Sequence, residues 1–262
     1  MGAAAFSLKP VAGRDAPCKI CRGKATLFGV VDFNKSCEDR RGAVLPPAGV
    51  PVHYRRCGEC GFLFTECFDD WTISDFKAHI YDECYAAVDP DFAEKRPASL
   101  RSMLDQLFPA LPRDLRILDY GGGEGALTSR LKADGFTAVA VYDPLVPDYA
   151  ALPSGPFDLI TCFETLEHVP DPVATVRQIA GLAALPGLVL FSTLVQGPEF
   201  QRLGMGWWYI GPRNGHISLF TTRALTLAWA REGYRVASLT GDLHLAFRQM
   251  PDFARHLVRK PA

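Results

Sequence analysis

From residue 115 onward the chain alternates short apolar runs with amphipathic stretches, and this alternation restricts its possible folds more than any other feature. The apolar runs predict strands at 115–120, 137–142, 157–163 and 187–193. Helices are expected at 124–134, from Asp171 onward and at 222–232. Strands that alternate with helices form a mostly parallel sheet with helices on both faces, so the sequence predicts an α/β fold. The final strand-like segments, YRVASLT and LHLAFRQ, lie too close together for a helical crossover and predict an antiparallel hairpin.

The segment LDYGGGEGAL, residues 118–127, follows the first predicted strand at the edge of the sheet where ligands of parallel sheets bind. Gly121 and Gly123 together with Ala126 satisfy the GxGxxG/A pattern of dinucleotide sites. Gly121, Gly123 and Gly125 equally satisfy the GxGxG pattern of enzymes that use S-adenosylmethionine. The loop alone leaves both cofactors open.

Four of the eight cysteines form two CxxC pairs, Cys18 with Cys21 and Cys57 with Cys60, separated by 35 residues. Each CxxC turn directs two thiolates at one ion, and two such turns complete a tetrahedral four-thiolate site. Zinc is the expected ion. Because four protein ligands leave no position for water, this zinc is expected to be structural and to stabilise a segment too short for a large core of its own.

Charge and the N-terminus indicate where the protein works and what it binds. The 28 basic and 29 acidic residues give a net charge of -1, so the composition provides no overall attraction to nucleic acid or anionic lipid. The N-terminus lacks the pattern of a signal peptide, and no apolar run approaches the roughly 18 residues of a membrane span. We therefore expect a cytoplasmic protein with no membrane partner and with reduced cysteines.

Three features resemble the class I S-adenosylmethionine-dependent methyltransferases: the segment DYGGGEG at 119–125, Asp143 after the second strand, and FDLITCFETLEHVPDP at 157–172. The resemblance implies a Rossmann-like methyltransferase sheet with S-adenosylmethionine as cofactor. It also implies that the glycines approach the amino-acid part of the cofactor, that Asp119 holds its ammonium and that Asp143 binds the ribose hydroxyls. Tyr85 in the preceding connector is expected to close over the cofactor. The full set of expected cofactor residues is Tyr85, Asp119, Tyr120, Gly121, Gly123, Gly125, Asp143, Pro144, Phe163 and Glu164.

Together with the two CxxC pairs, this core is similar to a narrower group, the zinc-containing methyltransferases that include sugar C-methyltransferases. Members that act on sugars continue into a further C-terminal domain, whereas this sequence ends after its last predicted strands. The resemblance therefore does not carry a sugar substrate to this chain.

We expect a zinc-binding module and connector at 1–85 and a methyltransferase domain at 86–262. Within the second, residues 195–220 are too long for a plain turn and are expected to form a lid. The aromatic residues 207–209 would line it, and Arg213 would contact an anion. His216 in this segment is the candidate general base because an imidazole titrates near neutral pH, and His168 is the second candidate.

The sequence thus predicts a methyltransferase that acts on a small molecule, with the acceptor, the methylated atom and the oligomeric state unspecified. Two alternatives stay open. One is an RNA methyltransferase, since nine Lys or Arg residues lie between positions 14 and 60 of the zinc module. The other is a non-enzymatic protein that keeps the cofactor fold and recruits a partner. A non-enzymatic protein of this kind would still bind its partner after Asp143 is substituted.

Overall fold

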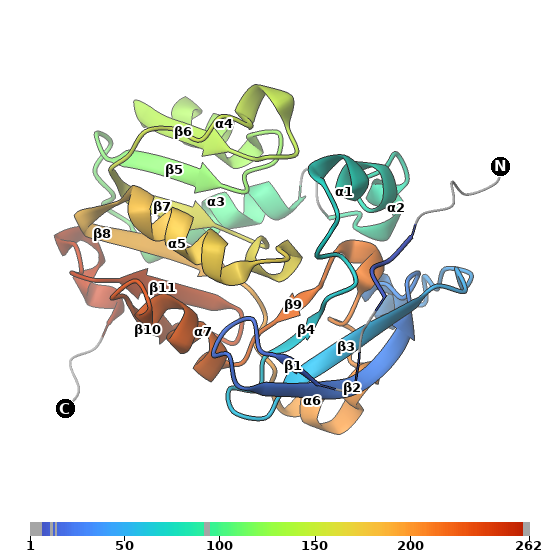
Figure 1. Ribbon diagram of the computed structural model, residues 1–262. Helices are drawn as coiled ribbons and strands as arrows, with labels where there is room; N and C mark the ends of the chain where they lie inside the picture. The colour runs from blue at the N-terminus through green and yellow to red at the C-terminus, as the bar shows by residue number, and fades with distance from the viewer. Residues whose placement is uncertain (1–6, 11–12, 14, 92–94, 259–262) are drawn as a thin grey trace. The chain divides into compact units, whose positions relative to one another are not determined.

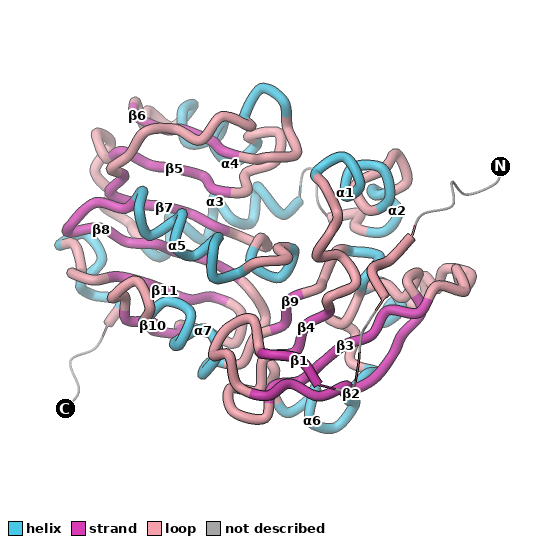
Figure 2. The backbone as a smooth tube through the Cα atoms, in the orientation of Figure 1, coloured by secondary structure: helices cyan, strands magenta, loops and turns pink. Residues whose placement is uncertain are grey.

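The structure is a computed structural model that describes residues 7–10, 13, 15–91 and 95–258. Its described residues form two compact units, each with strands in one sheet (Figures 1 and 2). The first unit comprises Met1–Pro90, Glu167–Pro172 and Val195–Ala224. The second comprises Asp91–Leu166, Val173–Leu194 and Leu225–Ala262.

The second unit contains the predicted mostly parallel sheet. Its six strands lie in the order β10-β11-β8-β7-β5-β6. They span Arg116–Tyr120 (β5), Ala138–Tyr142 (β6), Phe157–Cys162 (β7), Ala183–Ser192 (β8), Arg235–Ser238 (β10) and Leu243–Phe247 (β11). Strands β5 to β8 pair in parallel, and β11 pairs antiparallel with both β8 and β10. The parallel sheet and its terminal antiparallel hairpin confirm the fold class expected from the sequence.

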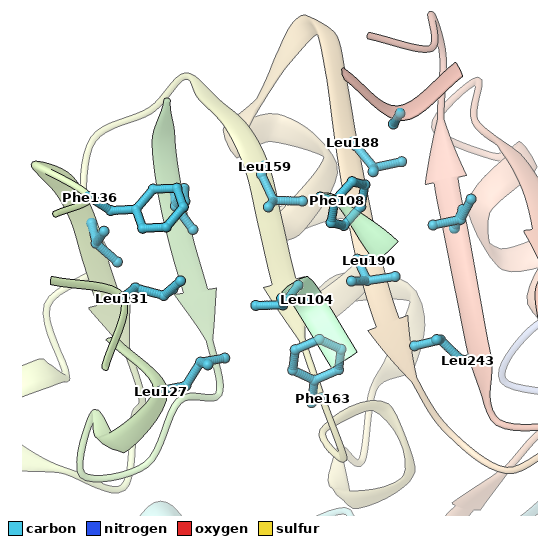
Figure 3. Close-up of a cluster of buried hydrophobic side chains, with 14 of the residues drawn as sticks. Leu104, Phe108, Leu127, Leu131, Phe136, Leu159, Phe163, Leu188, Leu190 and Leu243 are labelled. Carbon is cyan, nitrogen blue, oxygen red and sulfur yellow. The ribbon is translucent and has the colours of Figure 1, made fainter. Parts of the chain in front are cut away.

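Helices cover both faces of this sheet, as the alternating pattern predicts. They are α3 (Lys95–Leu107), α4 (Ala126–Ala133), α5 (Pro172–Leu182) and α7 (Thr222–Ala230). One apolar cluster joins α3 and α4 to the sheet through side chains such as Leu104, Leu131 and Leu159 (Figure 3). This packing holds the strand ends in fixed positions, so the loops that follow them have a rigid base.

The first unit is built on a five-stranded antiparallel sheet in the order β1-β2-β3-β4-β9. Its strands are β1 (Asp15–Pro17), β2 (Lys24–Asp32), β3 (Pro51–Cys57), β4 (Leu63–Thr65) and β9 (Ser218–Leu219), and its helices are α1 (Ile73–His79), α2 (Tyr85–Val88) and α6 (Pro198–Leu203). Buried aromatic side chains fill the unit, with Phe62 stacked on Phe64 and packed against Phe220.

The segment 195–220, expected as a lid of the methyltransferase domain, is grouped with the first unit. The physical reason is strand pairing, because Leu63 and Phe64 of β4 pair with Leu219 and Ser218 of β9. The segment contains α6 and short 3-10 turns, and His216 is buried. Across the described residues, every helix is too short or too polar to cross a membrane.

Candidate cofactor site and cysteine cluster

The glycine loop joins β5 to α4 and requires its glycines for steric reasons. Gly121, Gly123 and Gly125 have φ values of 74°, 53° and 75°, a region that favours glycine. A β-carbon on Gly121 would lie 2.3 Å from Thr165 Oγ1, and one on Gly122 would lie 2.6 Å from Asp119 Oδ2. The loop therefore keeps its backbone bare at the carboxyl end of β5.

Asp119 is a buried carboxyl group beneath this loop. It is 3% exposed, and its Oδ1 accepts a hydrogen bond from Thr161 Oγ1 at 2.8 Å. Burial raises the pKa of Asp119 from 3.8 to about 6; the Thr161 hydrogen bond opposes this shift and the charge of Asp143 adds to it. A cation beside this carboxylate would offset the cost of its burial.

Asp143 follows β6 and fixes the shape of the glycine loop. Its Oδ2 accepts from Gly123 N at 2.9 Å, and its Oδ1 accepts from Leu145 N at 2.8 Å. Each carboxylate oxygen can accept a second hydrogen bond, so both remain suitable acceptors for a diol. The structure thus brings Asp119 and Asp143 together around the loop in one unit.

Other expected cofactor residues contribute differently. The Phe163 side chain packs in the apolar core with Leu104 (Figure 3). The Tyr120 hydroxyl donates to Gln178 of α5, and burial raises the pKa of this tyrosine. Pro144 is exposed. Tyr85 is a buried residue of the first unit, where its ring lies 4.9 Å from that of Tyr81.

Glu164 adopts a left-handed backbone conformation with φ 46°, which is uncommon for a residue with a side chain. Ser192, at the end of β8, holds it: Ser192 Oγ accepts from Glu164 N at 2.9 Å and donates to Glu164 Oε1 at 2.7 Å. The strain fixes a carboxylate at the carboxyl edge of the sheet. Glu164 was predicted from the sequence, whereas its support by Ser192 and the support of Asp119 by Thr161 were not.

The two CxxC pairs form one cluster in the first unit. The sulfur atoms of Cys18 and Cys60 lie 3.6 Å apart, those of Cys21 and Cys57 lie 3.4 Å apart, and all four lie within 4.8 Å of one another. Four sulfurs at about 2.3 Å from a tetrahedral zinc ion would be about 3.8 Å apart. The hydrogen bond from Cys60 lowers the pKa of Cys18 to about 5. The donor set and its dimensions fit zinc.

The first unit also contains both candidate catalytic histidines. The rings of His168 and His216 meet edge to face, with centroids 4.8 Å apart. His216 Nδ1 donates to the Tyr209 carbonyl at 2.8 Å, which leaves Nε2 with the lone pair in the neutral ring. His168 Nδ1 lies 3.2 Å from the Tyr81 hydroxyl. Glu167, which was not among the site residues predicted from the sequence, lies beside both rings.

Arg213, expected to contact an anion, is buried and engaged within the first unit. Its guanidinium donates to both carboxylate oxygens of Asp82, at 2.8 and 3.0 Å, and to the Ile80 carbonyl at 2.7 Å. Trp207 is buried, and its indole N–H donates to Glu199. These contacts give Arg213 and Trp207 roles in packing.

Comparison with known proteins identifies the class to which these features belong. Residues 92–239 match the family model of the methyltransferase domain.

The chain belongs to this methyltransferase family.

The ubiquinone biosynthesis O-methyltransferase of Xanthomonas axonopodis pv. citri is 32% identical over 166 residues, which cover 52% of this chain and 70% of that protein. The enzyme of the same name from Sodalis glossinidius is 36% identical over 114 residues, 41% of this chain and 46% of that protein.

Among solved structures, an O-methyltransferase family protein from Burkholderia thailandensis resembles this methyltransferase in fold, with a TM-score of 0.50 and 12% identity. That match covers 68% of this chain and 63% of the solved one. The enzyme class predicted from the sequence, an S-adenosylmethionine-dependent methyltransferase, is confirmed. The matched region of the methyltransferase begins after both CxxC pairs, so the cysteine cluster lies outside it.

Proposed function

We propose that the protein transfers the methyl group of S-adenosylmethionine to a small-molecule acceptor whose reacting atom loses a proton. The observation that carries this proposal is the pair of carboxylates, Asp119 and Asp143, arranged around one glycine loop. The names of the curated relatives, O-methyltransferases, favour an oxygen as the methylated atom.

The cofactor residues divide into three tasks. The buried Asp119 carboxylate would hold the ammonium, whose positive charge offsets the cost of burial. Asp143 would accept the ribose hydroxyls with the lone pairs that Gly123 N and Leu145 N leave available. The bare loop backbone would lie along the methionine part. When bound, S-adenosylmethionine supplies an electrophilic methyl group, so the protein has mainly to orient the acceptor and receive its proton.

His216 is the group to which we assign that proton. Its Nδ1–H is committed to the Tyr209 carbonyl, and this hydrogen bond both orients the ring and makes Nε2 the basic atom. The His168 ring packs against it as the second candidate. A general base of this kind suits a hydroxyl acceptor, which must lose its proton as the new bond forms.

We further assign structural zinc to the cluster of Cys18, Cys21, Cys57 and Cys60. Backbone N–H groups of Ile20, Glu59 and Cys60 lie 3.4 to 3.5 Å from the sulfurs, which is the support that thiolate ligands usually receive. Four ligands complete the tetrahedron, so the ion would stabilise the first unit without binding the acceptor.

A small-molecule acceptor is favoured over RNA because several basic side chains of the module already have partners within it. Ion pairs join Lys19 to Asp69, Lys24 to Asp15, Arg41 to Glu38 and Arg55 to Glu66. Lys35 donates hydrogen bonds to the carbonyls of Trp207 and Ile210. The Arg56 guanidinium lies over the rings of Phe28 and Phe200. Arg14 lies outside the described residues. Arg55 and Lys19, at 1% and 14% exposure, are withdrawn from a phosphate-binding face, whereas Lys24 and Arg41 stay exposed.

Calorimetric titration of the zinc-loaded protein with S-adenosylmethionine tests the proposal, with NADH as the competing ligand. Asp143→Asn should weaken binding of S-adenosylmethionine at least tenfold, because the amide can no longer accept from both the loop and the ribose. Asp148→Asn removes the same charge from an exposed position nearby and should bind as the wild type does. Equal affinity in the Asp143 variant, or preference for NADH, would overturn the assignment, and salt-dependent binding to RNA would revive the alternative acceptor.

A further inference from the structure

Glu167 is a fully buried carboxyl group in the first unit, although it carries no part of the proposed cofactor site. Its Oε1 accepts a hydrogen bond from the Tyr209 hydroxyl at 2.5 Å. Its backbone carbonyl accepts from Ile217 N at 2.9 Å, directly after His216. Glu167 is thus anchored to the candidate base's own segment through both its side chain and its backbone.

The carboxylate and the two imidazoles form one compact cluster. Glu167, His168 and His216 each bring an oxygen or ring nitrogen within 4.8 Å of the other two. The Tyr209 ring packs edge to face against His216, with centroids 4.2 Å apart, and so fixes the distance between that ring and the carboxylate it hydrogen-bonds. An anion at this range, shielded from water, favours the protonated form of an imidazole.

The two histidines are oriented by their other contacts. His216 Nδ1 is bonded to the Tyr209 carbonyl, and His168 Nδ1 faces the Tyr81 hydroxyl. Gly215 makes room for the second contact, since a β-carbon there would lie 2.9 Å from His168 Nδ1. Such fixed rings can exchange a proton with a neighbour without reorganisation.

Further titratable groups surround the cluster, and their charges also influence the protonation of the two histidines. The residues that contact one of the two rings or the His216 backbone include Cys37, Tyr54, Tyr81 and Tyr209. The adjoining segments carry Lys35, Asp82 and Arg213. Asp82 and Arg213 pair with each other, and Lys35 donates to two backbone carbonyls. Glu167 is therefore the carboxylate that the geometry places beside both imidazoles.

We propose that Glu167 is a positioning residue that raises the proton affinity of the His168–His216 pair, so that the proton given up by the acceptor is retained in this cluster. The inference rests on the proposed function, because it deepens the role given there to His216. The alternative occupant of the cluster is a divalent cation held by the same three residues. The edge-to-face packing of the two rings favours a proton, since the edge of one ring is directed at the face of the other.

The test needs no acceptor. Histidine labelled with carbon-13 reports the titration midpoint of each of the six imidazoles by NMR in the zinc-loaded protein. His168→Gln and His216→Gln assign the two signals. Glu167→Gln, which keeps the size of the side chain and an oxygen that can accept from Tyr209, should lower the midpoint of at least one of the two rings by one pH unit or more, a tenfold loss of proton affinity.

Two matched variants separate charge from structure. Tyr209→Phe removes the hydrogen bond but keeps the carboxylate, and Glu167→Asp keeps the charge on a shorter side chain; both should stay within about half a pH unit of the wild-type midpoints. His53 and His79 serve as internal controls outside the cluster. Unchanged midpoints in Glu167→Gln would overturn the proposal, as would a shift in Tyr209→Phe or Glu167→Asp equal to that in Glu167→Gln, because a structural role would then suffice.

A cation is tested in the same samples. Broadening of the His168 and His216 signals by substoichiometric Mn²⁺, while the other histidine signals stay sharp, would assign the cluster to a metal and overturn the proton role. Titration with S-adenosylmethionine distinguishes this outcome from failure of the proposed function. Absence of cofactor binding would refute the proposed function. The measured midpoints would still decide whether Glu167 raises the proton affinity of the two histidines.

Discussion

Asp119→Asn is expected to stabilise the protein while weakening its hold on S-adenosylmethionine. The pKa of Asp119 rises from 3.8 to about 6 on folding because the carboxyl group is buried. A group whose pKa is higher in the folded state contributes stability that is present below pH 3.8 and is lost as the pH rises through about 6. The difference of about 2 pH units corresponds to roughly 3 kcal/mol at pH 7.5.

The neutral amide avoids this cost and keeps an oxygen that can accept from Thr161, so we expect Asp119→Asn to raise the free energy of unfolding at pH 7.5 by about 1 to 3 kcal/mol. At pH 4 the wild-type carboxyl group is protonated and the gain should vanish. The opposite effect is expected on the cofactor, because an amide does not attract an ammonium. The same substitution is therefore expected to raise stability and to weaken cofactor binding, as is common for functional groups that are buried to bind a ligand.

The same carboxyl group makes cofactor binding pH-dependent. With a pKa of about 6, Asp119 is about 9% ionised at pH 5 and about 99% ionised at pH 8, so the dissociation constant should rise about tenfold between pH 8 and pH 5. Calorimetry in two buffers with different ionisation enthalpies counts the released protons, and urea unfolding measures stability. An affinity that does not change with pH in the wild type, or an Asp119→Asn variant less stable at pH 7.5, would refute this reasoning.

Three further predictions concern other sites. Cys57→Ser or removal of zinc should abolish the folded first unit, because a structural ion contributes on the order of 10 kcal/mol; zinc content and circular dichroism measure this, and retained structure without metal would contradict it. Gly122→Ala should lower the free energy of unfolding by about 1 to 3 kcal/mol and weaken cofactor binding, because its β-carbon would meet Asp119. The control Gly135→Ala, in open space at φ 89°, should lower stability alone. Urea unfolding and calorimetry measure the two effects. Burial lowers the pKa of His244, so its stabilisation is present above pH 6.5 and lost as the pH falls; His244→Gln should flatten urea-unfolding stability between pH 7.5 and 5.

The sequence predicted the second unit well because its signals are local. The apolar runs located each strand to within a residue or two except β8, which begins at Ala183 and not at the predicted Gly187. Pro186 and Gly187 obscured the start of that strand, since both residues are typical of turns. The glycine loop and Asp143 were found because a backbone that must approach a ligand closely permits few residue types.

The pairing of β4 with β9 could not be predicted, because it joins segments about 155 residues apart through two residue pairs. Neither strand is long enough to show the alternation of apolar and polar residues that predicts a strand. The side chains that support the site were missed for a related reason. Thr161 and Ser192 lie within apolar strands, and only their partners across the sheet reveal what they hold.

This pairing changes what the zinc ion would stabilise. Thr221, which follows β9, donates to the Cys60 carbonyl at 2.6 Å, and Gln196 donates to the carbonyl of Gly61, so the segment that contains His216 is bonded to the second CxxC turn at both ends. A cysteine cluster in an independent N-terminal module would affect only that module when it lost its metal. Here the same loss would also disturb both ends of the segment that holds the candidate base, because Thr221 and Gln196 bond to the ligand turn itself. The proposed structural zinc would therefore support the segment that holds His216, although the ion takes no part in methyl transfer.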